Sequence, residues 1–265
     1  MTLSTQQVRE AAASLLEAER CCKFIEPLTS RYDMTLADAY AIAQVVASEK
    51  VEAGAVVKGH KIGFTSTAMR EMSGAEEPDF GRIFDYWFHD EGSAISLARM
   101  NRPAVEIELA FVLRKPLAGR HVNVADVIGA TEFILPSIEI VDSRMTTTGG
   151  PRFVVINSIA DGASCGGVVL GGRAVSPLEM DPKQVTGTLR INGEGRFSGK
   201  ASAVMGSPLN AVAWLARKLA EFDAGMEAGH VVLSGSFIRA APVAVGDRVS
   251  ASFGELGEVS FELAR

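Results

Sequence analysis

Two glutamates alternate with apolar residues in the stretch Val105-Glu106-Ile107-Glu108-Leu109, and this pattern constrains the fold more than any other feature of the chain. Successive side chains of a β-strand point to opposite faces, so Glu106 and Glu108 share one face and the apolar residues share the other. A third glutamate, Glu139, lies between two isoleucines in a second apolar segment. If the two strands are neighbours, their three carboxylates form one cluster.

A cluster of three carboxylates points to a hard metal ion. Carboxylates in a confined space repel one another unless a cation joins them. Oxygen ligands favour Mg²⁺, Mn²⁺ or Ca²⁺ over zinc. The alternative is an ordinary half-exposed strand with a solvated polar face, which is the commoner meaning of an alternating pattern. A metal site at these glutamates is therefore a hypothesis that needs further support.

Periodicity elsewhere predicts a β-rich body that follows a pair of helices. Helices are expected at about 5–23, from Thr35 to about residue 54, and at 65–72, 124–130, 153–160 and from Pro208 onward. Strands are expected at 55–64, 94–97, 104–113, 132–141, 166–170, 186–191, 196–198, 230–234, 248–253 and 258–263. Asn192-Gly193 is the strongest hairpin signal in the chain. Pro136 within its predicted strand indicates a sheet edge or a bulge. A loop is expected at residues 76–81 and a flexible connection at residues 145–151.

The order of these elements favours an α+β fold. Strands do not alternate regularly with helices, which argues against a doubly wound sheet. We therefore predict an N-terminal helical region over residues 1–54 and a β-rich catalytic domain over residues 55–265.

Composition excludes several classes of function. With a net charge of -6, the chain of 265 residues has no basic footprint for nucleic acid. Its three cysteines form no Cys-x-x-Cys pattern, which fits a reducing cytoplasm. The N-terminus lacks the pattern of a signal peptide, and no apolar run is long enough to span a membrane. We therefore expect a cytoplasmic protein without a nucleic-acid or membrane partner.

Lys61 and Asp79 are the candidate acid–base residues. A lysine with a shifted pKa acts as a general acid or base, and its charge can stabilise an enolate oxygen. His60 points to the opposite face of the predicted strand, so at most one of these two neighbours faces a site, and Lys61 is favoured. Asp79 is a candidate base near a metal. Each residue also fits a plainer role, as a surface lysine and as a turn-forming aspartate.

Three further residues are candidates for binding an anionic substrate. Ser164 lies in the Gly-rich segment 161–167, which is similar to an anion cradle but lacks the context of a nucleotide site. Ser236 lies in the segment 234–237, which lacks the Gly-x-Ser-x-Gly pattern of a hydrolase. Arg239 offers a planar fork for a carboxylate, against the commoner role of a surface arginine.

Several segments together resemble one known family along nearly the whole chain. They are Gly59-His60-Lys61-Ile62-Gly63-Phe64-Thr65-Ser66, Glu77-Pro78-Asp79-Phe80-Gly81, and the stretches 105–113, 135–144 and 206–216. In this order they resemble the 2-keto-4-pentenoate hydratase family, which belongs to the fumarylacetoacetate hydrolase superfamily.

The resemblance implies a mixed β-roll or sandwich core of the fumarylacetoacetate hydrolase C-terminal-domain type, with a small N-terminal helical appendage. It implies Mg²⁺ or Mn²⁺ bound by Glu106, Glu108 and Glu139, with Lys61 and Asp79 in the same pocket, and a homo-oligomer. The implied activity is that of a hydro-lyase of aromatic meta-cleavage catabolism, which adds water to a 2-hydroxy-dienoic or 2-oxo-enoic acid.

The finer resemblance favours a dicarboxylic substrate. It lies in the segments 88–90, 111–117 and 235–239. It implies 2-oxohept-4-ene-1,7-dioate as the substrate and 4-hydroxy-2-oxoheptanedioate as the product. If the substrate is such a diacid, we hypothesise that Arg239 meets its distal carboxylate.

Alternative functions remain open. One is decarboxylation of a vinylogous 2-oxo diacid, as in 4-oxalocrotonate decarboxylases. Another is a non-catalytic scaffold subunit, because family decarboxylases often associate with a hydratase as a pathway partner enzyme. The family usually carries Asp-Thr-(Ile/Val)-(Ala/Ser)-Asp-Asn-Ala where this chain has Asn157-Ser158-Ile159-Ala160-Asp161-Gly162-Ala163. The changes at Asn157 and Gly162 would alter specificity or activity if those side chains hold substrate or water.

Overall fold

The computed structural model describes residues 1–146 and 151–265, so positions 147–150 of the predicted connection lie outside the described residues. The α-helices are α1 (Thr5–Cys21), α2 (Leu36–Glu52), α3 (Thr67–Ser73), α4 (Val124–Ala130), α5 (Pro151–Ala160) and α6 (Pro208–Leu219). Short 3₁₀ helices include η3 (Gly162–Ser164) and η5 (Ala201–Ala203). Across the described ranges, no helix combines the length and the apolar character that a membrane crossing needs.

The strands form two sheets in the described parts of the chain. The larger sheet has the order β2-β1-β10-β5-β6-β7-β3, and β11 also pairs with β5. Its strands are β1 (Val57–Gly63), β2 (Asp79–Phe84), β3 (Phe88–His89), β5 (Ala104–Leu113), β6 (Thr131–Val141), β7 (Cys165–Leu170), β10 (Val231–Leu233) and β11 (Ala241–Pro242). The smaller sheet has the order β4-β13-β12-β8-β9, from β4 (Ala94–Ser96), β8 (Thr186–Ile191), β9 (Glu194–Lys200), β12 (Arg248–Ser252) and β13 (Glu258–Ala264).

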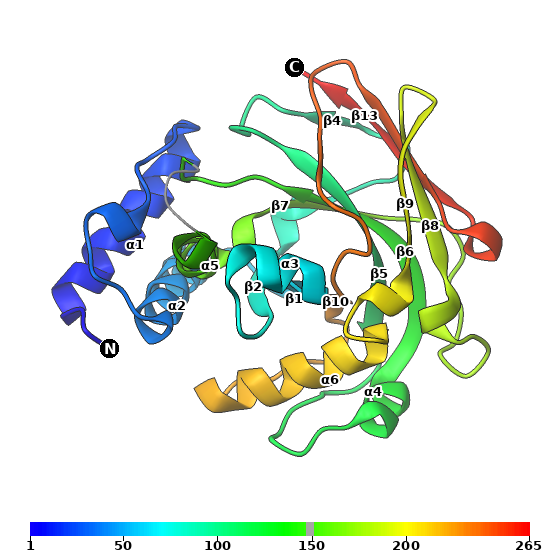
Figure 1. The fold of residues 1–265 in the computed structure, drawn as a ribbon, viewed down its shortest axis with the longest axis horizontal. Helices are drawn as coiled ribbons and strands as arrows, with labels where there is room; N and C mark the ends of the chain where they lie inside the picture. The colour runs from blue at the N-terminus through cyan, green and yellow to red at the C-terminus, as the bar shows by residue number, and fades with distance from the viewer. Residues whose placement is uncertain (147–150) are drawn as a thin grey trace.

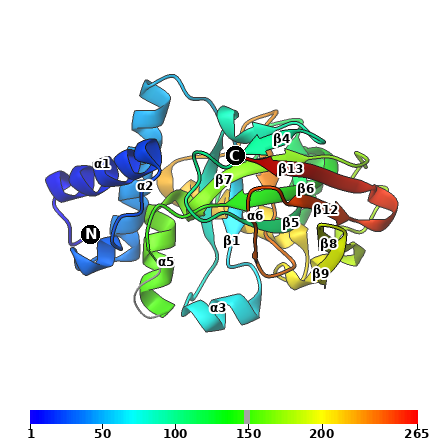
Figure 2. The ribbon, with the colours of Figure 1, turned by 90° about the horizontal axis from the view of Figure 1, so that it is seen from above.

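The helices and sheets share one core. Figures 1 and 2 show α1 and α2 on one side of the body, with α5 between them and the larger sheet, and the smaller sheet on the far side. The buried apolar residues run continuously from Val8 and Leu15 of α1 through Ile107 of β5 to Phe261 of β13. The α+β class and the curled-sheet architecture are therefore confirmed, whereas a domain boundary at residue 54 stays a prediction.

Local sequence signals explain where the first helices begin. Ser4 and Thr35 each accept a hydrogen bond from the third residue of their helix, and that residue's side chain bonds back to the cap, which forms a capping box. Asp38, the third residue of α2, is fully buried and also accepts hydrogen bonds from the backbone of Thr2 and Leu3. The N-terminus is therefore tied to the start of α2.

Two local expectations are wrong. The segment 76–81 is a loop only as far as residue 78, because Asp79 begins strand β2, which pairs with β1. Pro136 marks neither a sheet edge nor a bulge, since β6 lies between β5 and β7 and its register shifts occur elsewhere. The Pro136 carbonyl accepts a hydrogen bond from Gly171, immediately after β7 ends at Leu170. Proline has no backbone N–H to donate, and Pro136 lies where the strand pairing of β6 with β7 has already ended, so that pairing does not need an N–H at Pro136.

Candidate active site

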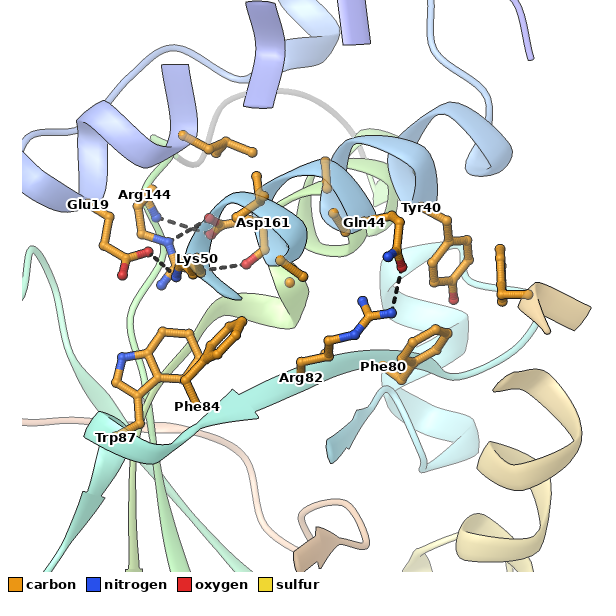
Figure 3. Close-up of a pocket in the computed structure, with 18 of the residues that line it drawn as sticks. Glu19, Tyr40, Gln44, Lys50, Phe80, Arg82, Phe84, Trp87, Arg144 and Asp161 are labelled. Atoms are coloured by element: carbon orange, nitrogen blue, oxygen red, sulfur yellow. Dashed lines mark hydrogen bonds and ion pairs between the residues drawn. The ribbon is translucent and has the colours of Figure 1, made fainter. Parts of the chain in front are cut away.

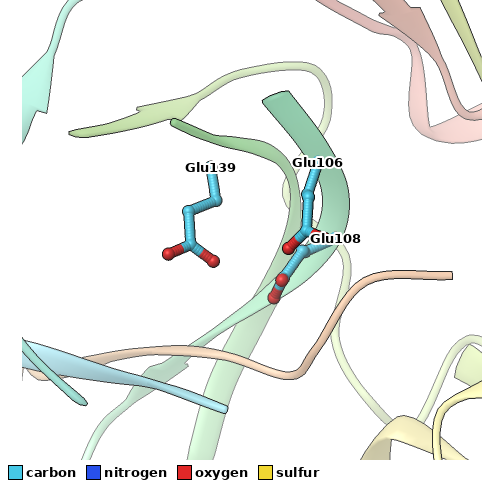
Figure 4. Close-up of side chains that lie close together, drawn as sticks. All are labelled: Glu106, Glu108 and Glu139. Carbon is cyan, nitrogen blue, oxygen red and sulfur yellow. The ribbon is translucent and has the colours of Figure 1, made fainter. Parts of the chain in front are cut away.

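Three glutamates converge on the concave side of the larger sheet. Glu106 of β5 lies directly opposite Glu139 of β6, and Glu108 lies two residues further along β5 on the same face. One ligand atom from each carboxylate lies within 4.8 Å of the others, and Figure 4 shows the three side chains turned toward one another. Glu108 and Glu139 are fully buried, and Glu106 is partly exposed.

Lys61 reaches this cluster because the sheet curls. Three steps of strand order separate β1, which carries Lys61, from β6, and three steps in a flat sheet span about 14 Å. The Lys61 Nζ nevertheless lies 3.3 Å from the Glu139 Oε1. The same Nζ donates a hydrogen bond of 2.9 Å to the Ala163 carbonyl of η3. His60, on the opposite face of β1, packs against the ring of His230 instead.

The glutamates have the properties of a cation site. In the described parts of the chain, the Glu139 Oε2 and the Glu108 Oε1 are buried without a hydrogen-bond or ion-pair partner, and the Glu139 Oε1 has only the Lys61 ammonium beside it. The remaining Glu108 oxygen accepts a hydrogen bond of 2.7 Å from the Gly235 N–H. Buried carboxylate oxygens without partners are costly unless they coordinate an ion. A donor set made only of carboxylate oxygen fits a hard divalent cation such as Mg²⁺ or Ca²⁺.

Burial and mutual repulsion disturb the titration of these groups. Burial, followed by the charges of Glu139 and Glu106, raises the pKa of Glu108 well above its ordinary value. Burial also raises the pKa of Glu139 to about 7, although the Lys61 ammonium opposes the rise. For Lys61 itself, burial lowers the pKa, but the surrounding carboxylates outweigh burial and raise it. Lys61 is therefore a stable cation at neutral pH.

Asp79 faces the same cavity from the first residue of β2. Its Oδ2 accepts a hydrogen bond of 2.9 Å from the Ser158 hydroxyl of α5, while its Oδ1 is buried without a partner in the described residues. Burial raises the pKa of Asp79, and the Lys61 charge opposes this. Gly63 lies opposite Asp79 in the register, and a Cβ at Gly63 would sit 2.2 Å from the Asp79 Oδ1. Any larger residue at Gly63 would displace the Asp79 carboxylate.

A left-handed turn holds the carbonyl that fixes Lys61. Gly162, Ala163 and Ser164 have φ values of 62°, 55° and 56°, and such a conformation costs non-glycine residues about 1–2 kcal/mol each. Asp161 stabilises the turn, because it accepts a hydrogen bond from the Ser164 hydroxyl and forms a buried ion pair of 2.6 Å with Arg144.

A cavity of about 170 Å³ joins most of the predicted site residues. Its lining includes Lys61, Asp79, Glu106, Ser164 and Ser236. The Ser236 hydroxyl donates a hydrogen bond to the Ile238 carbonyl.

Among the three predicted substrate-binding residues, Arg239 is the one that does not line this cavity. Its side chain is exposed, and its guanidinium stacks on Phe197 with a distance of 4.3 Å to the ring centroid.

A second, smaller cavity of about 40 Å³ lies on the other side of β2 (Figure 3). Phe80, Arg82 and Phe84 of β2 line it together with α2 residues such as Tyr40 and Lys50. None of the predicted catalytic or metal-binding residues lines this cavity in the described chain. The predicted acid–base residues Lys61 and Asp79 therefore lie at the larger of these two cavities.

The two departures from the family pattern lie away from the glutamates. The amide of Asn157 is buried and donates a hydrogen bond to the Thr29 hydroxyl, while its oxygen accepts one from the Thr29 backbone. Gly162 borders the second cavity, and a Cβ there would meet no atom within 4 Å. In the described residues, neither position lines the larger cavity.

Sequence reasoning missed three contributors to the site. Ser158 orients Asp79, the Gly235 N–H binds Glu108, and the Ala163 carbonyl binds Lys61. Two of these are backbone groups, whose role cannot be inferred from the identity of the residue. Ser158 lies on a helix at 153–160 that was predicted, but its partner Asp79 is distant in sequence.

Comparison with known proteins points to one family. Residues 67–264 match the family described as fumarylacetoacetate (FAA) hydrolase C-terminal. The chain is 39% identical to 2-oxo-hept-4-ene-1,7-dioate hydratase of Escherichia coli, over 94% of this chain and 95% of that protein. It is 37% identical to 2-hydroxyhexa-2,4-dienoate hydratase of Comamonas testosteroni, over 97% of both chains.

A solved structure shares nearly the whole fold. The 4-oxalocrotonate decarboxylase from Pseudomonas putida G7, complexed with magnesium and adipate, superposes with a TM-score of 0.94 at 33% identity over 99% of both chains. A second structure of that enzyme, complexed with calcium and acetate, gives a TM-score of 0.93.

Proposed function

Because the chain belongs to the fumarylacetoacetate hydrolase C-terminal family, we propose that it is a divalent-metal-dependent hydratase that adds water to a 2-hydroxy-dienoic acid or its 2-oxo-enoic tautomer. The proposed substrate is 2-oxohept-4-ene-1,7-dioate, which would give 4-hydroxy-2-oxoheptanedioate. The similarity to the E. coli hydratase over 94% of the chain supports this choice.

The observation that carries the proposal is the glutamate cluster beside Lys61 and Asp79. Glu108 and Glu139 are fully buried, and one oxygen of each lacks a partner in the described residues. A scaffold without catalysis has no need to maintain such a costly arrangement. The proposed cation is Mg²⁺ or Mn²⁺, held by Glu106, Glu108 and Glu139. When bound, it supplies positive charge that holds the substrate's carboxylate and 2-oxo group and stabilises enolate charge.

The chain's own residues would move the protons. Lys61 is protonated at neutral pH, so during ketonisation it would give a proton to C5 and regain one from the 2-hydroxyl group. Its ammonium would then donate a hydrogen bond to the 2-oxygen, where enolate charge develops. Asp79 has a free Oδ1 and a raised pKa, so it would take a proton from water as the water oxygen bonds to C4, and would return that proton at C3 to complete the hydration. Ser158 would fix the other Asp79 oxygen. Glu106, the most exposed of the three glutamates, is the alternative base.

The experiment that tests the proposal is a panel of 2-hydroxy-dienoates incubated with and without Mg²⁺. We expect dienol absorbance to fall only with the metal, and the product to have gained one water. Turnover that survives exhaustive chelation would contradict the metal requirement, and products without added water would contradict hydration.

Decarboxylation is the second candidate, supported by the similarity to the P. putida decarboxylase structure. A 2-oxo diacid held at the cation that these glutamates are proposed to bind could lose carbon dioxide and leave the same kind of dienolate. Mass analysis of the products separates the two reactions, because hydration adds one molecule of water and decarboxylation removes one molecule of carbon dioxide.

Several expectations stay predictions. They are the homo-oligomer, association with a pathway partner enzyme, and a cytoplasmic location. Separate N-terminal and catalytic domains also stay a prediction.

A further inference from the structure

The active-site cavity continues toward an open groove at its rim. Ser66, which follows β1, lines both the cavity of about 170 Å³ and a neighbouring groove of about 610 Å³. The groove also borders Thr67 and Arg70 of α3 and the segment around Ser202 and Met205. Figure 2 shows α3 at the rim of the body beside α5. A substrate bound in the cavity would therefore have the groove beside it, on the other side of Ser66.

The groove has the composition of a carboxylate subsite. Among the described residues that line it, Arg70 carries the only charge, and Ser66, Thr67 and Ser202 offer hydroxyl groups. Arg70 forms no ion pair with an acidic side chain in the described ranges. An arginine without an acidic partner that faces a hydroxyl-lined groove is suited to bind an anionic group of a ligand.

The Arg70 guanidinium is already held in place. Its Nη1 donates hydrogen bonds of 3.0 Å and 2.8 Å to the carbonyls of Phe64 and Thr65, and its Nη2 lies 3.4 Å from the Thr67 hydroxyl. A guanidinium has five N–H donors, so these contacts leave two for a ligand. The strand that carries Lys61 ends at Gly63, so the Phe64 and Thr65 carbonyls that hold Arg70 belong to the segment that directly follows it.

We propose that this groove is the subsite for the distal carboxylate of a dicarboxylic substrate, and that Arg70 rather than Arg239 binds it. This inference rests on the proposed function, because the other end of the substrate is placed at the glutamates. Arg239 is the competing residue. It is exposed and stacked on Phe197, and it lines neither the cavity nor the groove.

Two unreactive 2-oxo acids of equal length test the subsite. 2-Oxoheptanedioate and 2-oxoheptanoate share the 2-oxo acid group and differ only in the distal carboxylate. Calorimetry with the Mg²⁺-loaded protein should show the diacid binding at least about tenfold tighter. The Arg70→Met variant should lose about 10- to 100-fold in affinity for the diacid, and should bind the monoacid within about twofold of the wild type.

Arg239→Met is the matched control and should keep the preference for the diacid. Arg70→Lys keeps the charge but lacks the fork, so it should retain part of the preference even if Arg70→Met folds poorly. Equal binding of both acids by the wild type, or loss of the preference in Arg239→Met alone, would overturn the subsite. Those results would leave the proposed function intact if the dienoate panel shows Mg²⁺-dependent hydration. Failure of both acids to bind would overturn the two proposals together.

Discussion

Replacing Glu108 by glutamine should stabilise the metal-free protein while it abolishes metal binding. Glutamine has nearly the same shape, and its oxygen can still accept the hydrogen bond from the Gly235 N–H. What it removes is one negative charge within 4.8 Å of the other two carboxylates. Two unit charges at this separation repel by about 3.5 kcal/mol at an effective dielectric constant of about 20. The figure is for one fully ionised pair at the largest separation, and Glu108 takes part in two such pairs; a proton taken up by the cluster relieves part of this repulsion.

The gain in the free energy of unfolding that Glu108→Gln produces should grow with pH. The pKa of Glu108 in the folded protein lies well above its ordinary value of 4.5. Between these two values the folded state binds more protons than the unfolded state, so the free energy of unfolding falls as pH rises. The glutamine of Glu108→Gln does not ionise, so the variant does not lose stability in this way as pH rises. Its advantage over the wild type should therefore be small near pH 5 and largest near pH 8.

Thermal unfolding in EDTA measures the effect. A change of 1 kcal/mol shifts Tm by about 2–4 °C in a domain of this size, so a rise of several degrees is expected at pH 8. Added Mg²⁺ should raise Tm of the wild type but not of Glu108→Gln. Glu258→Gln, an exposed change on β13, serves as the control and should have little effect. A variant less stable than the wild type in EDTA at pH 8 would refute the reasoning.

Three further predictions concern single side chains. Lys61→Met should lower kcat by at least about 100-fold yet bind Mn²⁺ at least as well in calorimetry, because the ammonium repels the cation; full activity would exclude its role. Ser158→Ala should lower kcat about tenfold and move the acid limb of the pH–rate profile upward, because the hydrogen bond from Ser158 holds the pKa of Asp79 down and its loss raises that pKa; a changed Mg²⁺ affinity would contradict this. Burial lowers the pKa of His60 to about 3, so the free energy of unfolding should fall below pH 6.5 by up to about 1.4 kcal/mol per pH unit. His60→Leu should flatten that slope in urea titrations, and an unchanged slope would show that His60 is not its source.

Alternating and periodic segments were predictable from the sequence because their signals are local. The limits of β5, the Asn123 cap of α4 and the hairpin turn at Asn192-Gly193 needed only neighbouring residues, and the structure has all of them. The start of β2 at Asp79 was missed because Pro78 and the acidic residues before it resemble a turn. Its strand character comes from pairing with β1, which is a tertiary effect.

The glutamates of the site were predictable, whereas their surroundings were not. Alternation places Glu106 and Glu108 on one face, but only the register shows that Glu139 lies directly opposite Glu106. The contact of Lys61 with this pair depends on the curl of the sheet, which no local pattern encodes. The position of Arg239 outside the cavity illustrates the same limit, since an arginine side chain can reach several places from one backbone position.

Because Glu106 pairs directly with Glu139, the apolar core and the glutamate cluster depend on the same register between β5 and β6. If β5 slipped by one residue against β6, its acidic face would turn into the apolar core, and Val105, Ile107 and Leu109 would turn into the cavity. Such a misfolded chain would lose its stability and its proposed metal ligands in the same event. A population of stable but inert molecules with shifted strands should therefore not accumulate, and the fraction of protein that binds Mg²⁺ should equal the fraction correctly folded.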